Sequence, residues 1–151
     1  MSRVDFYHLQ KQTLEQVLPK LLTKAYASGK HVVVKIGTPE RVEFINTELW
    51  TYSDESFLPH GSKKDGFAAQ QPIWLTSEDE NPNEAAFLFL VDGAETTEDN
   101  ISKYERVFNI FDGNSEIALQ QSRDLWKRFK SAGNEVYYWQ QNETGSWEQK
   151  A

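Results

Sequence analysis

The stretch that decides the fold is RVFNIFDGNSEIALQQSRDLWKRFKSAG, residues 106–133. Its first six residues have the apolar, β-branched and aromatic composition of a strand. The chain then turns at Asp112-Gly113 and continues with apolar residues at helical spacing as far as Gly133, a natural C-terminal stop. A strand joined to a helix by a short turn is the repeating unit of α/β domains. The same Asp-Gly turn follows the strand pattern at 86–91, which indicates a second unit of this kind.

The helix predicted at 115–132 has an apolar side and a basic side. At about 100° per residue, an apolar stripe that must face the core contains Ala118, Leu125, Phe129 and Ala132. A basic cluster about 155° away contains Arg123, Lys127 and Lys130. Trp126 lies between the two. Either these residues form a pocket for an anionic group attached to something apolar, or they are a solvated face with a half-buried edge tryptophan.

Strand and helix patterns alternate along the rest of the chain. The other expected strands are 4–9, 31–36, 73–75, 86–91 and 135–139. One expected helix runs from Thr38-Pro39 to Trp50, and another lies between Thr13 and Gly29. Because Pro19 falls inside this last pattern, that helix is expected to begin nearer Gln16 or to kink. The alternation predicts a mostly parallel sheet covered on both faces, a three-layer α/β/α fold. Residues 1–139 are expected to form a single domain and 140–151 a polar, partly disordered tail.

Composition restricts the function. The chain has 151 residues, a net charge of -7 and no cysteine. An acidic protein is a poor match for phosphate backbones, so strong direct nucleic-acid binding is not expected. Without cysteine there is no disulfide framework and no thiolate metal site. The chain start lacks a signal-peptide pattern, and the longest apolar run, 85–91, is too short to span a bilayer. We therefore expect a soluble, cytoplasmic protein with no membrane contact.

The residues that catalysis would need are missing from the sequence. No glycine-rich turn follows the first strand, so a dinucleotide or phosphate loop is not expected. His8, His31 and His60 are widely separated and form no metal-ligand pair. The sequence also has no nucleophile elbow of the G-x-S-x-G type. These observations predict a protein that is not an enzyme and holds neither a metal nor a cofactor.

A second candidate surface lies in the middle of the chain. Trp50 and Phe57 flank a polar segment, and Pro59 stiffens the exit from it. Aromatic residues exposed on a rigid turn are typical of protein–protein contacts. The alternative is that both rings simply close the end of the sheet.

Several motifs stand in the same order as in one known family. They are Phe6-Tyr-His-Leu9, Leu49-Trp50, Glu55-Ser-Phe-Leu-Pro-His60, Pro72-Ile-Trp74, Arg123-x-x-Trp-Lys127 and Ala132-Gly133. Together they resemble the chi subunit of bacterial DNA polymerase III, an accessory subunit of the clamp loader. The resemblance covers nearly the whole chain. It implies a Rossmann-like fold without a nucleotide-binding glycine motif, and a role in DNA replication.

The resemblance also implies two partners and the residues that contact them. One partner is the acidic, phenylalanine-ended C-terminal tail of single-stranded DNA-binding protein. Its site by motif is Arg123, Trp126, Lys127 and Lys130, with Ile110 or Phe111 as the apolar wall. The other partner is the psi subunit of the clamp loader or an equivalent. Its site by motif is Trp50, Phe57, Pro59 and His60. Members of the family often have tyrosine where this chain has Trp126.

Two other functions are weighed beside this adaptor role. The alternation of strands and helices also suits a nucleotide-dependent α/β enzyme. Direct nucleic-acid binding is the third possibility, and the acidic balance counts against it.

Overall fold

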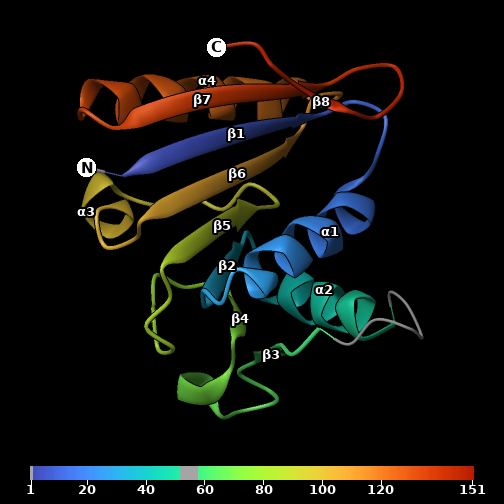
Figure 1. The fold of residues 1–151 in the computed structure, drawn as a ribbon, viewed down its shortest axis with the longest axis vertical. Helices are drawn as coiled ribbons and strands as arrows, with labels where there is room; N and C mark the ends of the chain where they lie inside the picture. The colour runs from blue at the N-terminus through green and yellow to red at the C-terminus, as the bar shows by residue number, and fades with distance from the viewer. Residues whose placement is uncertain (1, 52–57) are drawn as a thin grey trace.

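The protein is a three-layer α/β/α structure, which confirms the expected fold class (Figure 1). The computed structural model describes residues 2–51 and 58–151. The strands are β1 (Arg3–Leu9), β2 (Val32–Ile36), β3 (Gly61–Ser62), β4 (Ile73–Thr76), β5 (Phe87–Val91), β6 (Arg106–Asp112), β7 (Glu135–Gln141) and β8 (Trp147–Gln149). The helices are α1 (Leu14–Ala27), α2 (Pro39–Thr51), α3 (Glu98–Ile101) and α4 (Glu116–Ser131), with a short 3₁₀ turn, η1 (Ala68–Gln70).

The strands form one sheet in the order β3-β4-β2-β5-β6-β1-β7-β8. Neighbouring strands are parallel except for the antiparallel pair β7–β8. Helices α1 and α2 pack on one face of the sheet, and α3 and α4 on the other (Figure 1). Side chains alternate between the two cores, because successive strand residues point to opposite faces. In β1, for example, Tyr7 and Leu9 face the α1 side, whereas Val4 and Phe6 face the α4 side.

The chain direction diverges at the carboxyl ends of β1 and β6. These strands are neighbours, with Leu9 opposite Asp112. The chain leaves β1 into α1 on one face and leaves β6 into α4 on the other (Figure 1). In open α/β sheets such a point creates a crevice beyond the strand ends, where ligands commonly bind.

Helix α1 begins at Leu14, so the prediction of a start nearer Gln16 was wrong. The Thr13 hydroxyl accepts a hydrogen bond from the Gln16 amide at 3.3 Å, and the Gln16 side chain accepts one from the Thr13 amide at 2.9 Å. This capping box satisfies two amides of the first turn. It stabilises the turn upstream of Pro19, which is buried inside the helix.

The end of the chain contains a strand pair that the sequence pattern did not predict. Strand β7 continues to Gln141 rather than ending at Trp139, and Trp147 pairs with Gln141 as the chain returns in β8. The Gln141 side-chain oxygen accepts hydrogen bonds from the amides of residues 10–12 at 3.2–3.3 Å. The buried Gln141 side chain therefore bonds the loop at residues 10–12 and does not contact water.

None of the helices in the described ranges is long and apolar enough to cross a membrane.

Candidate functional site

Helix α4 is fixed by its cap and by its apolar stripe. The Ser115 hydroxyl accepts a hydrogen bond from the Ala118 amide at 3.2 Å, which caps the first turn. Leu125 and Phe129 are buried against the sheet, as the sequence predicted. Ala132 lies at the C-cap and is exposed, so it does not belong to the buried stripe. The packing of this stripe presents Trp126 and the neighbouring cations along the side of β7.

A groove of about 280 Å³ lies between α4 and β7. The α4–β7 groove is lined by Phe111, Leu119, Ser122, Arg123, Trp126, Lys127, Tyr138 and Ala151. Trp126 is half-buried and packs edge-on against Phe6, with ring centroids 5.5 Å apart, and against Tyr138 at 6.0 Å. These contacts hold the indole in place, so one side of a rigid aromatic ring borders the groove.

The structure decides between Ile110 and Phe111 as the apolar wall. Phe111 lines the α4–β7 groove and is 7% exposed. Ile110 points to the opposite face of the sheet and belongs to the core under α1. Consecutive strand residues cannot face the same side, so only Phe111 contributes to this groove.

The three predicted cations lie at the α4–β7 groove or against the Trp126 ring. Arg123 and Lys127 line the groove, and the Lys130 ammonium lies 5.7 Å from the centre of the Trp126 ring. Within residues 2–51 and 58–151, no ion pair uses Arg123, Lys127 or Lys130. Arg128 on the same helix differs, because it bonds Glu98 at 3.0 Å.

Tyr138 is a groove residue that the sequence analysis missed. Its hydroxyl lies 2.5 Å from Nδ1 of His8, a hydrogen bond that fixes the ring. Burial lowers the pKa of His8 despite the nearby Asp112 carboxylate, and Arg123 lowers it further. Burial also raises the pKa of Tyr138, which Arg123 partly opposes. The alternation of Val136 and Tyr138 in β7 was the signal for a ring on the α4 side.

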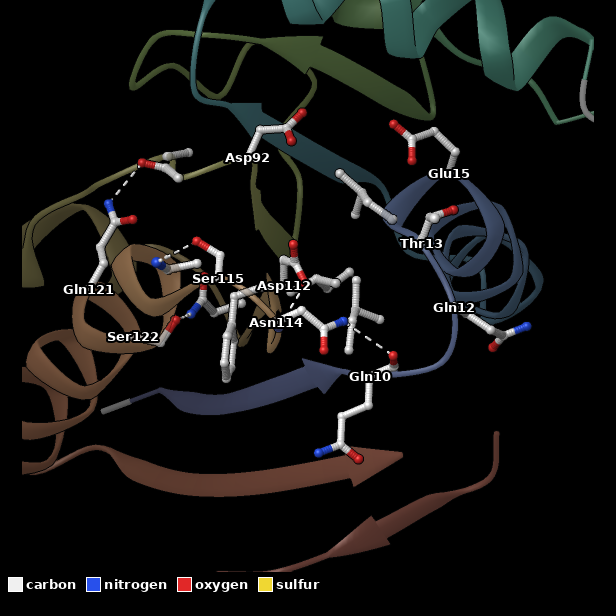
Figure 2. Close-up of a pocket in the computed structure, with 18 of the residues that line it drawn as sticks. Gln10, Gln12, Thr13, Glu15, Asp92, Asp112, Asn114, Ser115, Gln121 and Ser122 are labelled. Atoms are coloured by element: carbon white, nitrogen blue, oxygen red, sulfur yellow. Dashed lines mark hydrogen bonds between the residues drawn. The ribbon is translucent and has the colours of Figure 1, made fainter. Parts of the chain in front are cut away.

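The crevice beyond the carboxyl ends of β1 and β6, where the chain leaves to opposite faces of the sheet, is a separate cavity of about 510 Å³, the switch-point crevice (Figure 2). Two helices begin at its rim, but Thr13 and Ser115 already cap them. Figure 2 shows the carboxylates of Glu15, Asp92 and Asp112 around the opening. Arg41, which also lines it, bonds both Asp92 and Glu15 at 2.9 Å. A phosphate group would therefore meet three carboxylates, an arginine that is already paired and the exposed Lys11.

We accordingly expect ATP, NAD and NADP to bind no tighter than about millimolar, or about 4 kcal/mol. The physical reason is repulsion from the carboxylates of the switch-point crevice, whose arginine is already paired. Calorimetric titration with each nucleotide checks this. A micromolar heat signal from any of them would contradict it and favour the enzyme alternative.

No cluster of three or more potential metal ligands occurs in the part of the chain that the structure describes.

The second predicted surface is centred on Trp50, at the end of α2. Trp50 is 46% exposed, and its ring packs against His60 at an interplanar angle of 35°, with centroids 4.1 Å apart. His60 itself is only 2% exposed, and its ring nitrogens lie 2.6 Å from the Leu58 carbonyl and 3.2 Å from the Asn46 carbonyl. His60 therefore packs against the Trp50 ring from the interior and does not reach the surface. Pro59 is half-buried, and Phe57 lies outside the described residues.

Comparison with known proteins gives two matches. Residues 1–137 match the family described as DNA polymerase III chi subunit, HolC. The chain is also similar to a probable DNA polymerase III subunit chi from Rickettsia prowazekii (strain Madrid E). The two are 29% identical over 155 residues, which cover 97% of this chain and 91% of the relative.

Proposed function

Since this chain belongs to the DNA polymerase III chi subunit family, we propose that it is a non-catalytic adaptor of the replication machinery. In this role it links the clamp loader to single-stranded DNA-binding protein by holding the acidic C-terminal tail of that protein. The observation that carries the proposal is the α4–β7 groove, an apolar slot bordered by cations that form no ion pair within residues 2–51 and 58–151. Its place of action is the cytoplasm, where a bacterial chromosome is replicated.

The groove suits a peptide that ends in phenylalanine. The terminal ring would be buried between Trp126 and Phe111, a contribution of about 2–3 kcal/mol for a well-covered side chain. The free carboxylate would accept charge-assisted hydrogen bonds from Arg123 or Lys127. Aspartates earlier in the tail would face Lys130 as exposed pairs of about 0.2–1 kcal/mol each.

Ordering a disordered tail opposes these gains. A dissociation constant on the order of micromolar is the expected balance. Such a weak contact is sufficient, because several tails on one oligomer coating the DNA raise the effective concentration of the peptide.

The second contact is proposed at the Trp50 surface, and by the family motif it also uses Phe57 and Pro59. A half-exposed indole supported by a buried imidazole offers a rigid anchor for a partner protein. The proposed partner is the psi subunit of the clamp loader or its equivalent.

Co-purification of two variants tests both contacts in one experiment. Arg123→Ala should lose single-stranded DNA-binding protein from a cell-extract pull-down but retain the clamp-loader partner. Trp50→Ala should lose the clamp-loader partner but retain single-stranded DNA-binding protein. Phe57→Ala should give the same result as Trp50→Ala. Arg123 and Trp50 are both exposed, so the midpoint of thermal unfolding of each variant should change by only a few degrees.

Phe44→Ala is the matched control for the second contact, since Phe44 is an exposed aromatic residue on the same helix, α2. This control should retain both partners. Loss of both partners from either single variant would contradict the assignment of separate sites.

A further inference from the structure

A third concave surface lies on the opposite face of the sheet from the α4–β7 groove. Helices α1 and α2 cover the β2, β4 and β5 side of that face, whereas β1 and β7 lie open in front of α4 (Figure 1). A hollow of about 470 Å³ forms there, within the size range of small-ligand pockets. This β1–β7 hollow is bounded by Leu21 and Lys24 of α1 on one side and Trp147 of β8 on the other.

The floor of the β1–β7 hollow is aromatic. Tyr7 lies between Phe108 and Trp139, with centroid separations of 6.1 Å and 6.3 Å and nearly parallel rings. Trp147 packs edge-on against Tyr7 at 5.0 Å. Both tryptophans remain partly exposed, although each is held by its neighbours. Such fixed rings bury large ligand groups at a small cost in conformational entropy.

The charges of the hollow are unbalanced. The buried Asp5 carboxylate is shared by Arg106 at 2.8 Å and Arg3 at 3.1 Å, and it also accepts a hydrogen bond from the Trp139 indole at 2.9 Å. Two guanidinium groups on one carboxylate leave one positive charge in excess. Lys24, exposed on the rim, adds another. Arginine presents several donors in a planar fork, so a second carboxylate can bind beside the first.

We propose that the β1–β7 hollow is a docking site for a segment of a partner protein in which an aromatic side chain lies next to a single carboxylate. The ring packs against Trp139 and Trp147, and the carboxylate bonds Arg106 and Lys24. The local excess is two positive charges, one from the arginine pair and one from Lys24, and a single carboxylate can bond both groups. A polyanion such as single-stranded nucleic acid would also be repelled by the net charge of -7 on the whole protein.

N-acetyltryptophan is the probe that tests this, because it combines one indole with one carboxylate. The intact protein labelled with ¹⁵N is titrated, and the indole N–H signals of Trp126, Trp139 and Trp147 are followed by NMR. We expect saturable shifts of Trp139 and Trp147 at millimolar probe. The uncharged N-acetyltryptophanamide should bind at least about tenfold more weakly, since it lacks the anion.

Variants separate this site from the α4–β7 groove. Lys24→Glu should abolish the shifts of Trp139 and Trp147, whereas Lys20→Glu, an exposed change on the same helix, should preserve them. Arg123→Ala should also preserve them, so failure of the adaptor role would not affect this result. Equal binding of acid and amide, or shifts at Trp126 alone, would overturn the proposal. Preferential shifts with oligothymidylate would overturn it in favour of nucleic acid.

Discussion

Trp126→Ala is expected to weaken binding of an acidic, phenylalanine-ended peptide by about 30-fold or more, or about 2 kcal/mol. The substitution removes the ring that borders the α4–β7 groove. Because ring burial is not electrostatic, the loss should be the same at every salt concentration. Fluorescence anisotropy of a labelled tail peptide across a salt series measures it. Trp126→Tyr should retain most of the affinity, since tyrosine keeps an aromatic ring at the groove.

The loss of affinity caused by removing a cation should depend on salt concentration, unlike the loss caused by Trp126→Ala. Lys130→Ala removes an exposed charge, so its effect should fade as the Debye length falls from about 10 Å at 0.1 M to about 3 Å at 1 M. Arg123→Ala should cost about 1.5–3 kcal/mol if its guanidinium holds the terminal carboxylate. Arg128→Ala is the matched control, because that residue is paired with Glu98 on the same helix. It should leave binding unchanged.

An amidated peptide provides the decisive comparison for Arg123. It keeps the terminal ring but lacks the terminal charge. If it binds as tightly as the free acid, then the carboxylate role of Arg123 is wrong, even if Trp126 still matters.

The largest loss of stability is expected for Phe129→Ala. Phe129 is 0% exposed and anchors α4 on the sheet. Emptying such a site costs about 3–5 kcal/mol of the free energy of unfolding. For a chain of this size the midpoint of thermal unfolding should fall by about 6–20 °C. Circular dichroism during heating measures the shift. Peptide binding should also weaken, because Phe129 no longer anchors α4 on the sheet.

Phe67→Ala is the control for this prediction. Phe67 is 78% exposed, so the same substitution should change the free energy of unfolding by no more than about 0.5 kcal/mol. Equal shifts for the two variants would show that Phe129 does not anchor the helix.

The sequence alone predicted the layers and much of the candidate site. Strands with apolar residues on both faces, such as Val32–Ile36, are read correctly because a covered parallel sheet leaves no polar face. The stripe of Leu125 and Phe129 fixed the orientation of α4, and with it the side on which Trp126 and Arg123 lie. Helical and strand periods are local properties, so they can be read from neighbouring residues.

Only the tertiary structure decided which distant residues meet. Strand order places β7 beside β1, and this brings Tyr138 and His8 into contact across 130 positions of sequence. The same neighbourhood places Asp5 among Arg3, Arg106 and Trp139. The burial of His60 against Trp50 could not be predicted from the sequence either, because a single histidine in a loop belongs to no periodic pattern that indicates burial. Periodicity fixes which way a side chain points, whereas the packing of the whole chain fixes what it touches.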